Sequence, residues 1–347
     1  MRITAEKTKL PVIQGLRGIA SFAVCWCHFT AATKIFSNHP LIAASGRNGD
    51  LGVIVFFVIS GFIIPYTLMD SGYRLKLFPK FMLKRIVRVD PPYLVAIAIA
   101  VALGVLSYHS SLFKGTPPHY TAVQMLLHLG YLIPFSHYKW VNVVFWTLAV
   151  EFQYYLLLGL LLPVLSSKIR LLRAGSILLW ISMPFMVSLP QSLPWYSPLF
   201  AMGITSALWR KRVIGGVEFG CYVMASMVAC CLKLEMRETV AGILAIVCIL
   251  WLRWMPVWML ALGDLSYSLY LIHLPVGGRI MNLGARFVPD NLRVLLLLPT
   301  VALVLSLAYF LYRFVEVPAK HWASKIKYSH SNRRRGPAIE KAHVVAH

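Results

Sequence analysis

The sequence predicts an all-helical, polytopic integral membrane protein with about ten transmembrane helices. Of its 347 residues, 59% are hydrophobic and only 13% are charged, and the mean hydropathy is +0.69. The apolar residues recur in stretches of about 20, the length that a helix needs to cross roughly 30 Å of hydrocarbon. Together, this composition and this pattern exclude a soluble domain.

Ten apolar stretches are interpreted as membrane spans. In chain order they cover residues 12–31, 50–69, 89–108, 143–165, 171–189, 195–209, 213–231, 239–254, 262–281 and 292–313. Another stretch, 121–136, is too short and too polar for a span, so we interpret it as a re-entrant or interfacial segment. The first stretch lacks a small-residue cleavage pattern, which predicts a retained helix rather than a signal peptide.

The basic residues predict the orientation of these spans. Lys and Arg number 34 against 12 Asp and Glu, which gives a formal net charge of +22. With ten spans, 24 of the 34 fall on the side that holds both termini, and the positive-inside rule makes that side cytoplasmic. We therefore expect a cytoplasmic N-terminus (1–11), a membrane domain (12–318) and a basic, disordered cytoplasmic tail (319–347). Basic residues in short loops and a tail favour membrane lipids over nucleic acid as partners.

Arg17 and His28 stand eleven residues apart in the first span. At ~100° per residue, eleven steps come close to three full turns, so both side chains project from one helix face, roughly 16 Å apart. Ionisable groups inside lipid cost about 2.5 kcal/mol or more unless they face protein or water. The pair is either a functional stripe or a snorkelling arginine with a hydrogen-bonded core histidine.

Arg85 and Arg88 lie just before the third span, three residues apart and hence on one face of a helix. Two adjacent guanidiniums can grip phosphate oxygens in bidentate fashion, although ordinary cytoplasmic anchors have the same composition. Asp90 is followed by two prolines, which predicts a helix start with Asp90 as its cap.

Other polar residues lie inside predicted spans. Glu151 would be neutral or paired at that depth, so a structural ion pair is the alternative to a functional role. Ser60 lies beside a glycine, which suits close helix packing. Tyr270 and His273 share a helix face and either line a polar cavity or form a core hydrogen bond.

Two further acidic residues are assigned structural roles. Glu218 lies near the cytoplasmic end of its predicted span, and Asp264 is interpreted as a possible helix cap. The six cysteines form no Cys-x-x-Cys pair and no zinc-like spacing with histidine, so neither disulfides nor a metal are predicted.

Six segments of the chain, spread from about residue 13 to 320, resemble landmarks of one family. They are, in order, GLRGIASFAVCWCH, GDLGVIVFFVISGF, KRIVRVDPPYL, FWTLAVEFQYYL, LGDLSYSLYLIHLPV and FVEVPAK. The chain resembles the membrane acyltransferase-3 family, whose bacterial members O-acylate exopolysaccharides, lipopolysaccharide and Nod factors. It resembles the stand-alone form, without a fused extracytoplasmic domain.

The resemblance implies roles residue by residue. The family's Arg-x10-His element matches Arg17 and His28, and its Arg-x-x-Arg element matches Arg85 and Arg88. Its Ser-Leu-x-x-Glu element appears here with threonine for serine. That element and the Tyr-Ser-Leu-Tyr-x-x-His element correspond to Thr147 to Glu151 and Tyr267 to His273.

One departure concerns the second span. The family often has an acidic residue just before the Phe pair, whereas this chain has Val55 there. An acidic role is carried over only if Asp50, one turn earlier, substitutes.

The function implied is acyl transfer, with acetyl the leading candidate, from cytoplasmic acyl-CoA to a hydroxyl of an extracytoplasmic or lipid-linked carbohydrate. Acyl transfer needs a base for the hydroxyl proton and a group that stabilises the oxyanion. His28 is expected to be the base or a transient acyl carrier, and Glu151 to orient or charge-balance the site. Arg85, Arg88 and Arg17 are expected at the phosphates of acyl-CoA.

Ser60, Tyr270 and His273 remain candidates for the acceptor site or for structural roles. The expected location is the bacterial inner membrane. The rival hypothesis is a transporter or flippase for a glycan or an anionic small molecule. Only the enzyme would consume acyl-CoA and release free thiol, so thiol release distinguishes the two. The sequence leaves the acyl group, the acceptor and the oligomeric state open.

Overall fold

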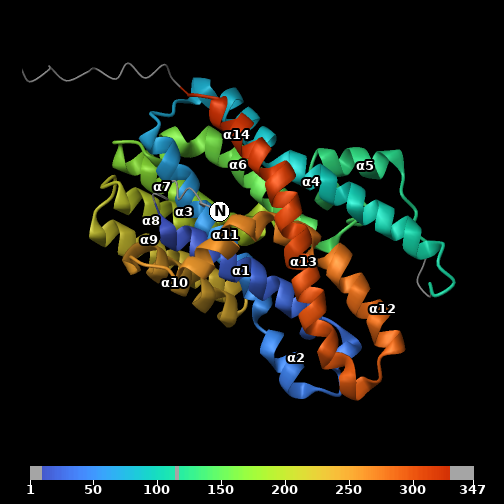
Figure 1. The fold of residues 1–347 in the computed structure, drawn as a ribbon. Helices are drawn as coiled ribbons and strands as arrows, with labels where there is room; N and C mark the ends of the chain where they lie inside the picture. The colour runs from blue at the N-terminus through green and yellow to red at the C-terminus, as the bar shows by residue number, and fades with distance from the viewer. Residues whose placement is uncertain (1–9, 114–116, 329–347) are drawn as a thin grey trace, which may run out of the picture.

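The computed structural model describes residues 10–113 and 117–328, and in these residues it contains helices and no strand (Figure 1). The α-helices are α1 (Pro11–Thr30), α2 (Pro40–Gly46), α3 (Gly52–Asp70), α4 (Phe78–Tyr108), α5 (Ala122–Leu129), α6 (Trp146–Leu165), α7 (Arg170–Met186), α8 (Leu193–Arg210), α9 (Gly216–Lys233), α10 (Met236–Trp251), α11 (Val257–Ile272), α12 (Arg279–Phe287), α13 (Leu297–Leu311) and α14 (Val317–Lys325). Two π-helical turns, η6 (His273–Gly278) and η8 (Tyr312–Glu316), continue α11 and α13.

The prediction of an all-helical fold is confirmed for the described residues. Seven helical stretches are long and apolar enough to cross a membrane, and they contain α1, α3, α4, α6, α9, α11 and α13. The helices α7, α8 and α10 form where spans are predicted but fall outside that group, so the count of ten stays a prediction. The stretch 121–136 contains the eight-residue helix α5, which is too short to cross a bilayer.

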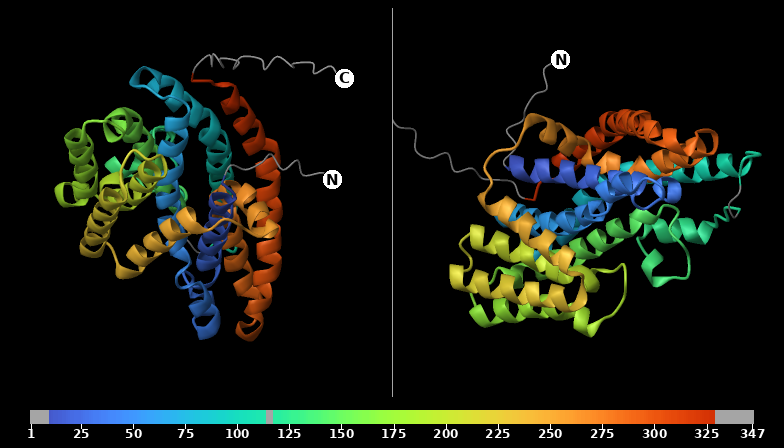
Figure 2. Two further views of the ribbon diagram at one scale, coloured as in Figure 1. Left: turned by 90° about the vertical axis from the view of Figure 1, so that its left-hand side faces the viewer. Right: turned by 90° about the horizontal axis from the view of Figure 1, so that it is seen from below.

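The helices pack around two hydrophobic clusters. The α3 cluster contains buried residues of α3 and of the five helices from α6 through α10. Phe62 and Phe200 are two of these residues. The α13 cluster joins buried residues of α1, α4, α11 and α13, such as Tyr93 and Val304. The axes of most of these helices are roughly aligned with one another (Figure 2). The cavities described below take their linings from helices of both clusters.

Glycines bring two pairs of helices into close contact. A Cβ atom on Gly18 of α1 would lie 2.6 Å from the backbone nitrogen of Gly263 in α11. A Cβ atom on Gly61 of α3 would lie 2.4 Å from the carbonyl oxygen of Phe200 in α8. Such backbone-to-backbone approach is what small residues permit in membrane helices. The expectation of close packing beside Ser60 is confirmed.

The start of the third span differs from the prediction. Helix α4 begins at Phe78 and continues through Pro91 and Pro92, so Asp90 is not a cap. The Asp90 carboxylate instead accepts a hydrogen bond from the Tyr131 hydroxyl at 2.9 Å. Proline costs a helix one backbone hydrogen bond, but Pro92 and its neighbour Tyr93 are buried. Tertiary packing therefore outweighs the local signal.

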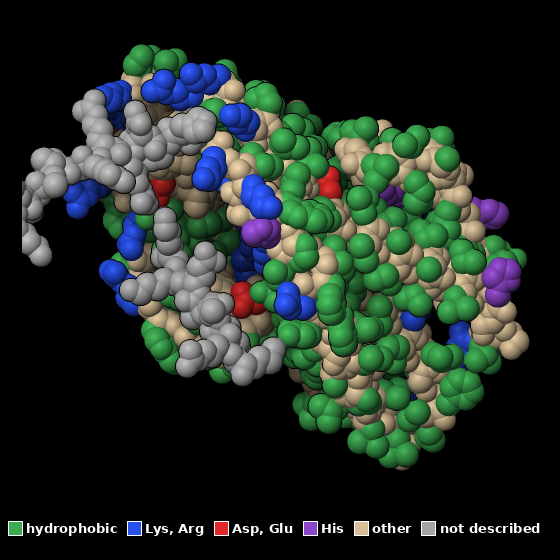
Figure 3. Space-filling view, turned by 45° about the horizontal axis from the view of Figure 1, so that its top comes forward, with side chains coloured by type: hydrophobic (Ala, Val, Ile, Leu, Met, Phe, Trp, Pro, Cys, Tyr) green, Lys and Arg blue, Asp and Glu red, His purple; other side chains and the backbone are tan. Residues whose placement is uncertain are grey.

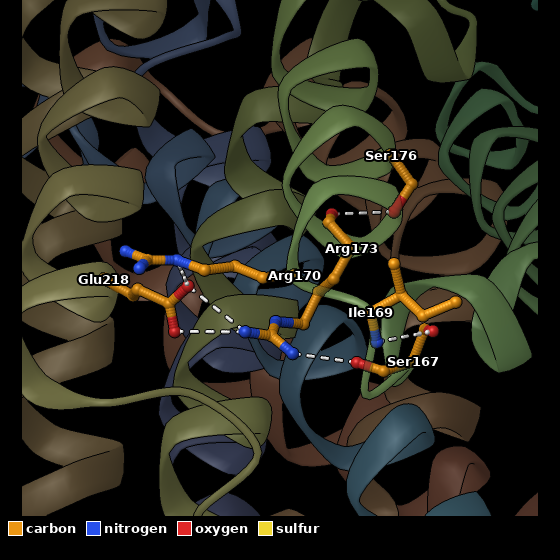
Figure 4. A network of polar contacts seen from close by, with 6 residues as sticks. All are labelled: Ser167, Ile169, Arg170, Arg173, Ser176 and Glu218. Atoms are coloured by element: carbon orange, nitrogen blue, oxygen red, sulfur yellow. Dashed lines mark hydrogen bonds and ion pairs between the residues drawn. The ribbon is translucent and has the colours of Figure 1, made fainter.

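Two other acidic residues have partners in the helix bundle. Asp264 lies in the middle of α11, where it accepts a hydrogen bond from Gln14 of α1 at 2.7 Å, so it is not a cap either. Glu218 of α9 forms ion pairs with Arg173 and Arg170 of α7, at 3.1 and 3.0 Å (Figure 4). The structural role predicted for Glu218 is therefore confirmed.

Charge is unevenly distributed over the surface. On the face shown in Figure 3, Lys and Arg side chains gather toward the end of the molecule where α14 lies, while hydrophobic side chains cover most of the rest. Helix α14 continues past the predicted domain boundary at 318. Most of the predicted disordered tail, residues 329–347, lies outside the described residues.

Candidate functional site

The predicted site residues are divided between two cavities. The inner cavity, about 180 Å³ in volume, is lined by six of them: Arg17, Ser60, Arg85, Arg88, Glu151 and Tyr270. The outer pocket, about 550 Å³, is lined by His28 together with residues of η6, α12 and the turn after α1. His273 lines neither cavity and lies buried between them.

A third space adjoins the inner cavity near one end of the bundle. This entrance cavity, about 530 Å³, shares Arg17 and Arg88 with the inner cavity. Leu10, just before α1, and Lys320 of α14 both line it, so the two ends of the described chain meet on the same side of the bundle. The entrance cavity therefore lies on the side of the inner cavity that carries both ends of the described chain.

Three guanidiniums face the inner cavity from two helices. Arg17 comes from α1, whereas Arg85 and Arg88 come from one face of α4, as their spacing predicts. Among the described residues, none of the three forms an ion pair or a side-chain hydrogen bond. The Nε atoms of Arg17 and Arg85 are buried without a hydrogen-bond partner. Buried cations without partners are costly, so this arrangement favours an anionic ligand.

Aromatic rings support Arg85. Its guanidinium lies 5.4 Å from the ring centre of Phe81 and 5.3 Å from that of Tyr155, which are cation–π distances. The rings hold the guanidinium in place without consuming its N–H donors, which stay available to a ligand.

The carboxylates of the inner cavity do not neutralise these arginines by direct contact. Glu316 of η8 accepts from Lys320 at 2.7 Å and from Ser268 at 2.6 Å. Glu151 of α6 accepts a hydrogen bond from the Ser60 hydroxyl of α3 at 2.6 Å. The structural ion pair considered for Glu151 is absent among the described residues, and its partner there is a neutral hydroxyl.

Tyr270 lines the inner cavity and packs against His273. Its hydroxyl lies 2.9 Å from that of Thr147, which in turn donates to the carbonyl oxygen of Val144 at 3.0 Å. The threonine that replaces the family's serine therefore still supplies a hydroxyl. A hydrogen bond between the Tyr270 and His273 side chains, one expectation for this pair, does not form.

His273 instead contacts the histidine of the first span. Its Nε2 atom lies 3.1 Å from Nδ1 of His28, and its ring lies behind Tyr270, with ring centres 5.8 Å apart. The two histidines are 245 residues apart, so sequence spacing gave no signal for this contact. The close packing of α1 on α11 brings them together.

Asp50 is the residue considered as a substitute for the acidic residue that the second span lacks. It lies in the turn η2 (Gly49–Leu51), where Arg237 binds its carboxylate oxygens at 2.8 and 3.1 Å. It lines none of the three cavities. Within the described ranges, no group of three or more His, Cys, Asp or Glu side chains is placed to hold a metal ion.

Comparison with known proteins adds the family. A family model for an acyltransferase domain, Acyl_transf_3, matches residues 10–234. ORF330 of Acidianus two-tailed virus, which bears the name of an acetyltransferase, is 29% identical over 300 residues, covering 78% of this chain and 84% of that protein. Acyltransferase MdmB of Streptomyces mycarofaciens is 28% identical over 159 residues, covering 43% of this chain and 38% of MdmB. No solved structure is a significant match.

Proposed function

Because the chain belongs to the Acyl_transf_3 family of acyltransferases, we propose that it moves an acyl group, with acetyl the leading candidate, from acyl-CoA to a carbohydrate hydroxyl. The observation that carries the donor assignment is the group of three guanidiniums without carboxylate partners, Arg17, Arg85 and Arg88, that line the inner cavity. Two of them, Arg17 and Arg88, also line the entrance cavity. Acyl-CoA is a polyanion with a long, narrow arm, and both features suit this site.

The donor fits the two connected cavities in sequence. The nucleotide end takes the wider entrance cavity, its phosphates meet Arg88 and Arg17, and the pantetheine arm extends into the inner cavity. Glu151, which accepts a hydrogen bond from Ser60, offsets part of the positive charge of the three arginines in the inner cavity. The thioester then lies near the wall made by Tyr270 and Thr147, which separates it from His28.

The acceptor takes the outer pocket, where His28 is available. In the proposed reaction, the imidazole of His28 removes the proton from the acceptor hydroxyl while the oxygen of that hydroxyl bonds to the thioester carbon. The carbon–sulfur bond then breaks, and the CoA thiolate takes the proton from His28 and leaves as free thiol. If His28 is itself acylated first, its imidazole nitrogen attacks the thioester carbon, the carbon–sulfur bond breaks and CoA leaves as the thiolate. The acceptor hydroxyl then takes the acyl group from the imidazole, and its proton goes to the CoA thiolate, which leaves free thiol and free His28. Both routes require rotation of the Tyr270 side chain to join the cavities.

The orientation follows from the same assignment. Acyl-CoA is cytoplasmic, so the entrance cavity and both ends of the described chain would face the cytoplasm and the outer pocket would face outward. The bacterial inner membrane and an extracytoplasmic or lipid-linked glycan acceptor complete the proposal. Reporter fusions at the C-terminus should give a cytoplasmic signal, and fusions near Gly115 an extracytoplasmic one.

The experiment that tests the enzyme assignment follows free thiol. Purified protein in lipid nanodiscs receives acetyl-CoA, and thiol release is measured with and without a glycan extract from the host membrane. We expect release that depends on the extract, together with a mass increase of one acetyl group on the modified glycan. Transport of the glycan without thiol release would contradict the enzyme and support the transporter hypothesis, which the position of two cavities on opposite sides also permits.

A further inference from the structure

The structure contains a direct contact between two histidines from distant parts of the chain. His28 lies near the end of α1, and His273 lies where α11 passes into the π-helical turn η6. His28 Nδ1 and His273 Nε2 are 3.1 Å apart, within hydrogen-bond distance. One of these two nitrogens must carry the proton, and the surrounding groups decide which.

His273 can be assigned first. Its Nδ1 atom lies 2.8 Å from the carbonyl oxygen of Tyr270 and 3.2 Å from that of Leu269. Carbonyl oxygens only accept hydrogen bonds, so this Nδ1 carries a proton. The ring is fully buried and contacts no carboxylate among the described residues, which favours the neutral form. A neutral imidazole has one N–H, so Nε2 of His273 is an acceptor.

His28 then follows. Its Nδ1 atom lies between two acceptors, Nε2 of His273 and the carbonyl oxygen of Val24 at 3.0 Å. Both contacts are attractive only if Nδ1 of His28 carries the proton. The lone pair of His28 is therefore on Nε2, which has no hydrogen-bond partner among the described residues. Because the Nδ1 edge of the ring is occupied, the opposite edge is the one left to face the outer pocket.

We propose that His273 is a positioning residue: its Nε2 accepts the Nδ1–H of His28 and thereby orients the His28 ring with Nε2 as the reacting nitrogen in the outer pocket. This inference rests on the proposed function. During the reaction Nε2 of His28 gains the hydroxyl proton and then passes it to the CoA thiolate, while His273 neither gains nor loses a proton. The lone pair of His273 and the Val24 carbonyl stabilise the positive charge that His28 carries in between.

The chain offers a matched control in His128. It is also fully buried, and its Nδ1 also contacts a backbone carbonyl four residues earlier, that of Gln124 at 2.8 Å. Its Nε2, however, accepts from the backbone N–H of Val141 at 3.0 Å rather than from another histidine. It lines none of the three cavities. Loss of His128 thus removes a buried imidazole of the same kind without touching His28.

The first test is spectroscopic and needs no substrate. Full-length protein labelled with ¹⁵N-histidine is examined by NMR for coupling between two ring nitrogens across a hydrogen bond. We expect one such coupling, with the proton on Nδ1 of His28, present in wild type and in His128→Phe and lost in His273→Gln and His28→Gln. Absence of the coupling in folded wild-type protein, or a proton on Nε2 of His273, would overturn the inference.

The second test is kinetic. Partners that orient a metal-ligating histidine typically contribute about 10–100-fold, and we expect a similar range for a partner that orients a catalytic histidine. His273→Phe should therefore lower kcat for thiol release by about that factor while KM for acetyl-CoA stays within about 2-fold. His273→Gln, whose side-chain oxygen can accept the Nδ1–H, should recover part of the loss. His128→Phe should lower the melting temperature without this loss of kcat.

The two levels of proposal fail in different ways. One outcome would contradict the positioning role of His273 alone: His28→Gln is inactive, while His273→Phe and His128→Phe have equal kcat values. The enzyme assignment would then still hold. Active His28→Gln would end the assignment of His28 as the base, whatever the nitrogen coupling shows.

Discussion

The inner cavity and the outer pocket differ in almost every physical respect. The inner cavity is the smaller, about 180 Å³ against 550 Å³, and is lined by long helices that carry three guanidiniums and two carboxylates. The outer pocket is lined by one end of α1 and by short segments, and its main polar groups are His28, Lys34, Asn282 and Arg293.

This difference separates recognition from chemistry. The residues that suit a polyanionic donor are on the inner side, where helices hold them in fixed positions. The residue that suits proton transfer, His28, borders the outer side and contacts His273, whose ring packs against Tyr270 of the inner cavity. Substitutions on the two sides should therefore affect different kinetic parameters.

The largest effect is expected on the outer side. His28→Ala removes the proposed base, and loss of a positioned base typically costs ~10²–10⁴-fold in rate. His28→Gln should be equally inactive, because an amide cannot take a proton at neutral pH. Both variants should still bind acetyl-CoA with wild-type Kd, measured by calorimetry. Weakened donor binding in these variants would break the separation between the two cavities.

Arginine substitutions should produce the opposite pattern. Each charge-assisted hydrogen bond contributes roughly 1.5–3 kcal/mol, so Arg88→Ala should raise the Kd for acetyl-CoA by about 10–100-fold. Arg88→Lys should weaken binding less, since lysine keeps the charge and loses the bidentate fork. Arg170→Ala is the control, because Arg170 lies outside the three cavities with a side chain that is 79% exposed. If the Arg85→Ala/Arg88→Ala double variant inserts correctly and its Kd for acetyl-CoA is unchanged, the two arginines serve only as topological anchors.

A single polar contact in the outer pocket should have a smaller effect. Asn282 of α12 lines this pocket, and one neutral hydrogen bond contributes about 1 kcal/mol. Asn282→Ala should therefore lower glycan acetylation about 5-fold, measured by mass spectrometry of the product, with no change in Kd for acetyl-CoA. A change in donor affinity alone would place the acceptor elsewhere.

The smallest effect sharpens the charge argument. Glu151→Gln keeps an oxygen that can accept from Ser60 and removes one negative charge from the inner cavity. With three cations present, the Kd for CoA should fall about 3-fold, an effect that increases at low salt. Glu218→Gln, which breaks the network in Figure 4 away from the cavities, should leave this Kd unchanged. Weaker CoA binding in Glu151→Gln would show that the carboxylate contacts the donor directly.

The sequence predicted the class of fold and six of the residues that line the inner cavity. Helical spacing placed Arg85 and Arg88 on one face. The free-energy cost of an ionisable side chain in lipid indicated that Arg17 and Glu151 need polar surroundings. Those arguments succeed because they depend on neighbours within one helix or on the membrane as solvent. The same local reasoning failed at Asp90, where packing of α4 overrides the two prolines.

Contacts between distant helices were out of reach of such reasoning. The hydrogen bond between His28 and His273 depends on the crossing of α1 and α11, and the pairing of Asp50 with Arg237 depends on how α10 packs near α3. The division of the predicted residues between two cavities likewise depends on where Tyr270 lies in three dimensions. A residue missed altogether is Lys320, which lines the entrance cavity and pairs with Glu316. Its only signal in the sequence was its place at the end of the FVEVPAK segment.

The tight contact of α1 with α11 has a consequence for how the protein is made. Gly18 meets Gly263, and Gln14 bonds to Asp264, across about 250 residues of chain. At ~5–20 residues per second, translation needs roughly 10–50 s to reach α11 after α1 has emerged. During that interval Arg17 and His28 lack the helix that covers them, so the first helix must wait in the membrane or in the insertion machinery. The site is therefore completed late in biogenesis, and a nascent chain released before α11 carries the arginines of the inner cavity but neither Tyr270 nor His273.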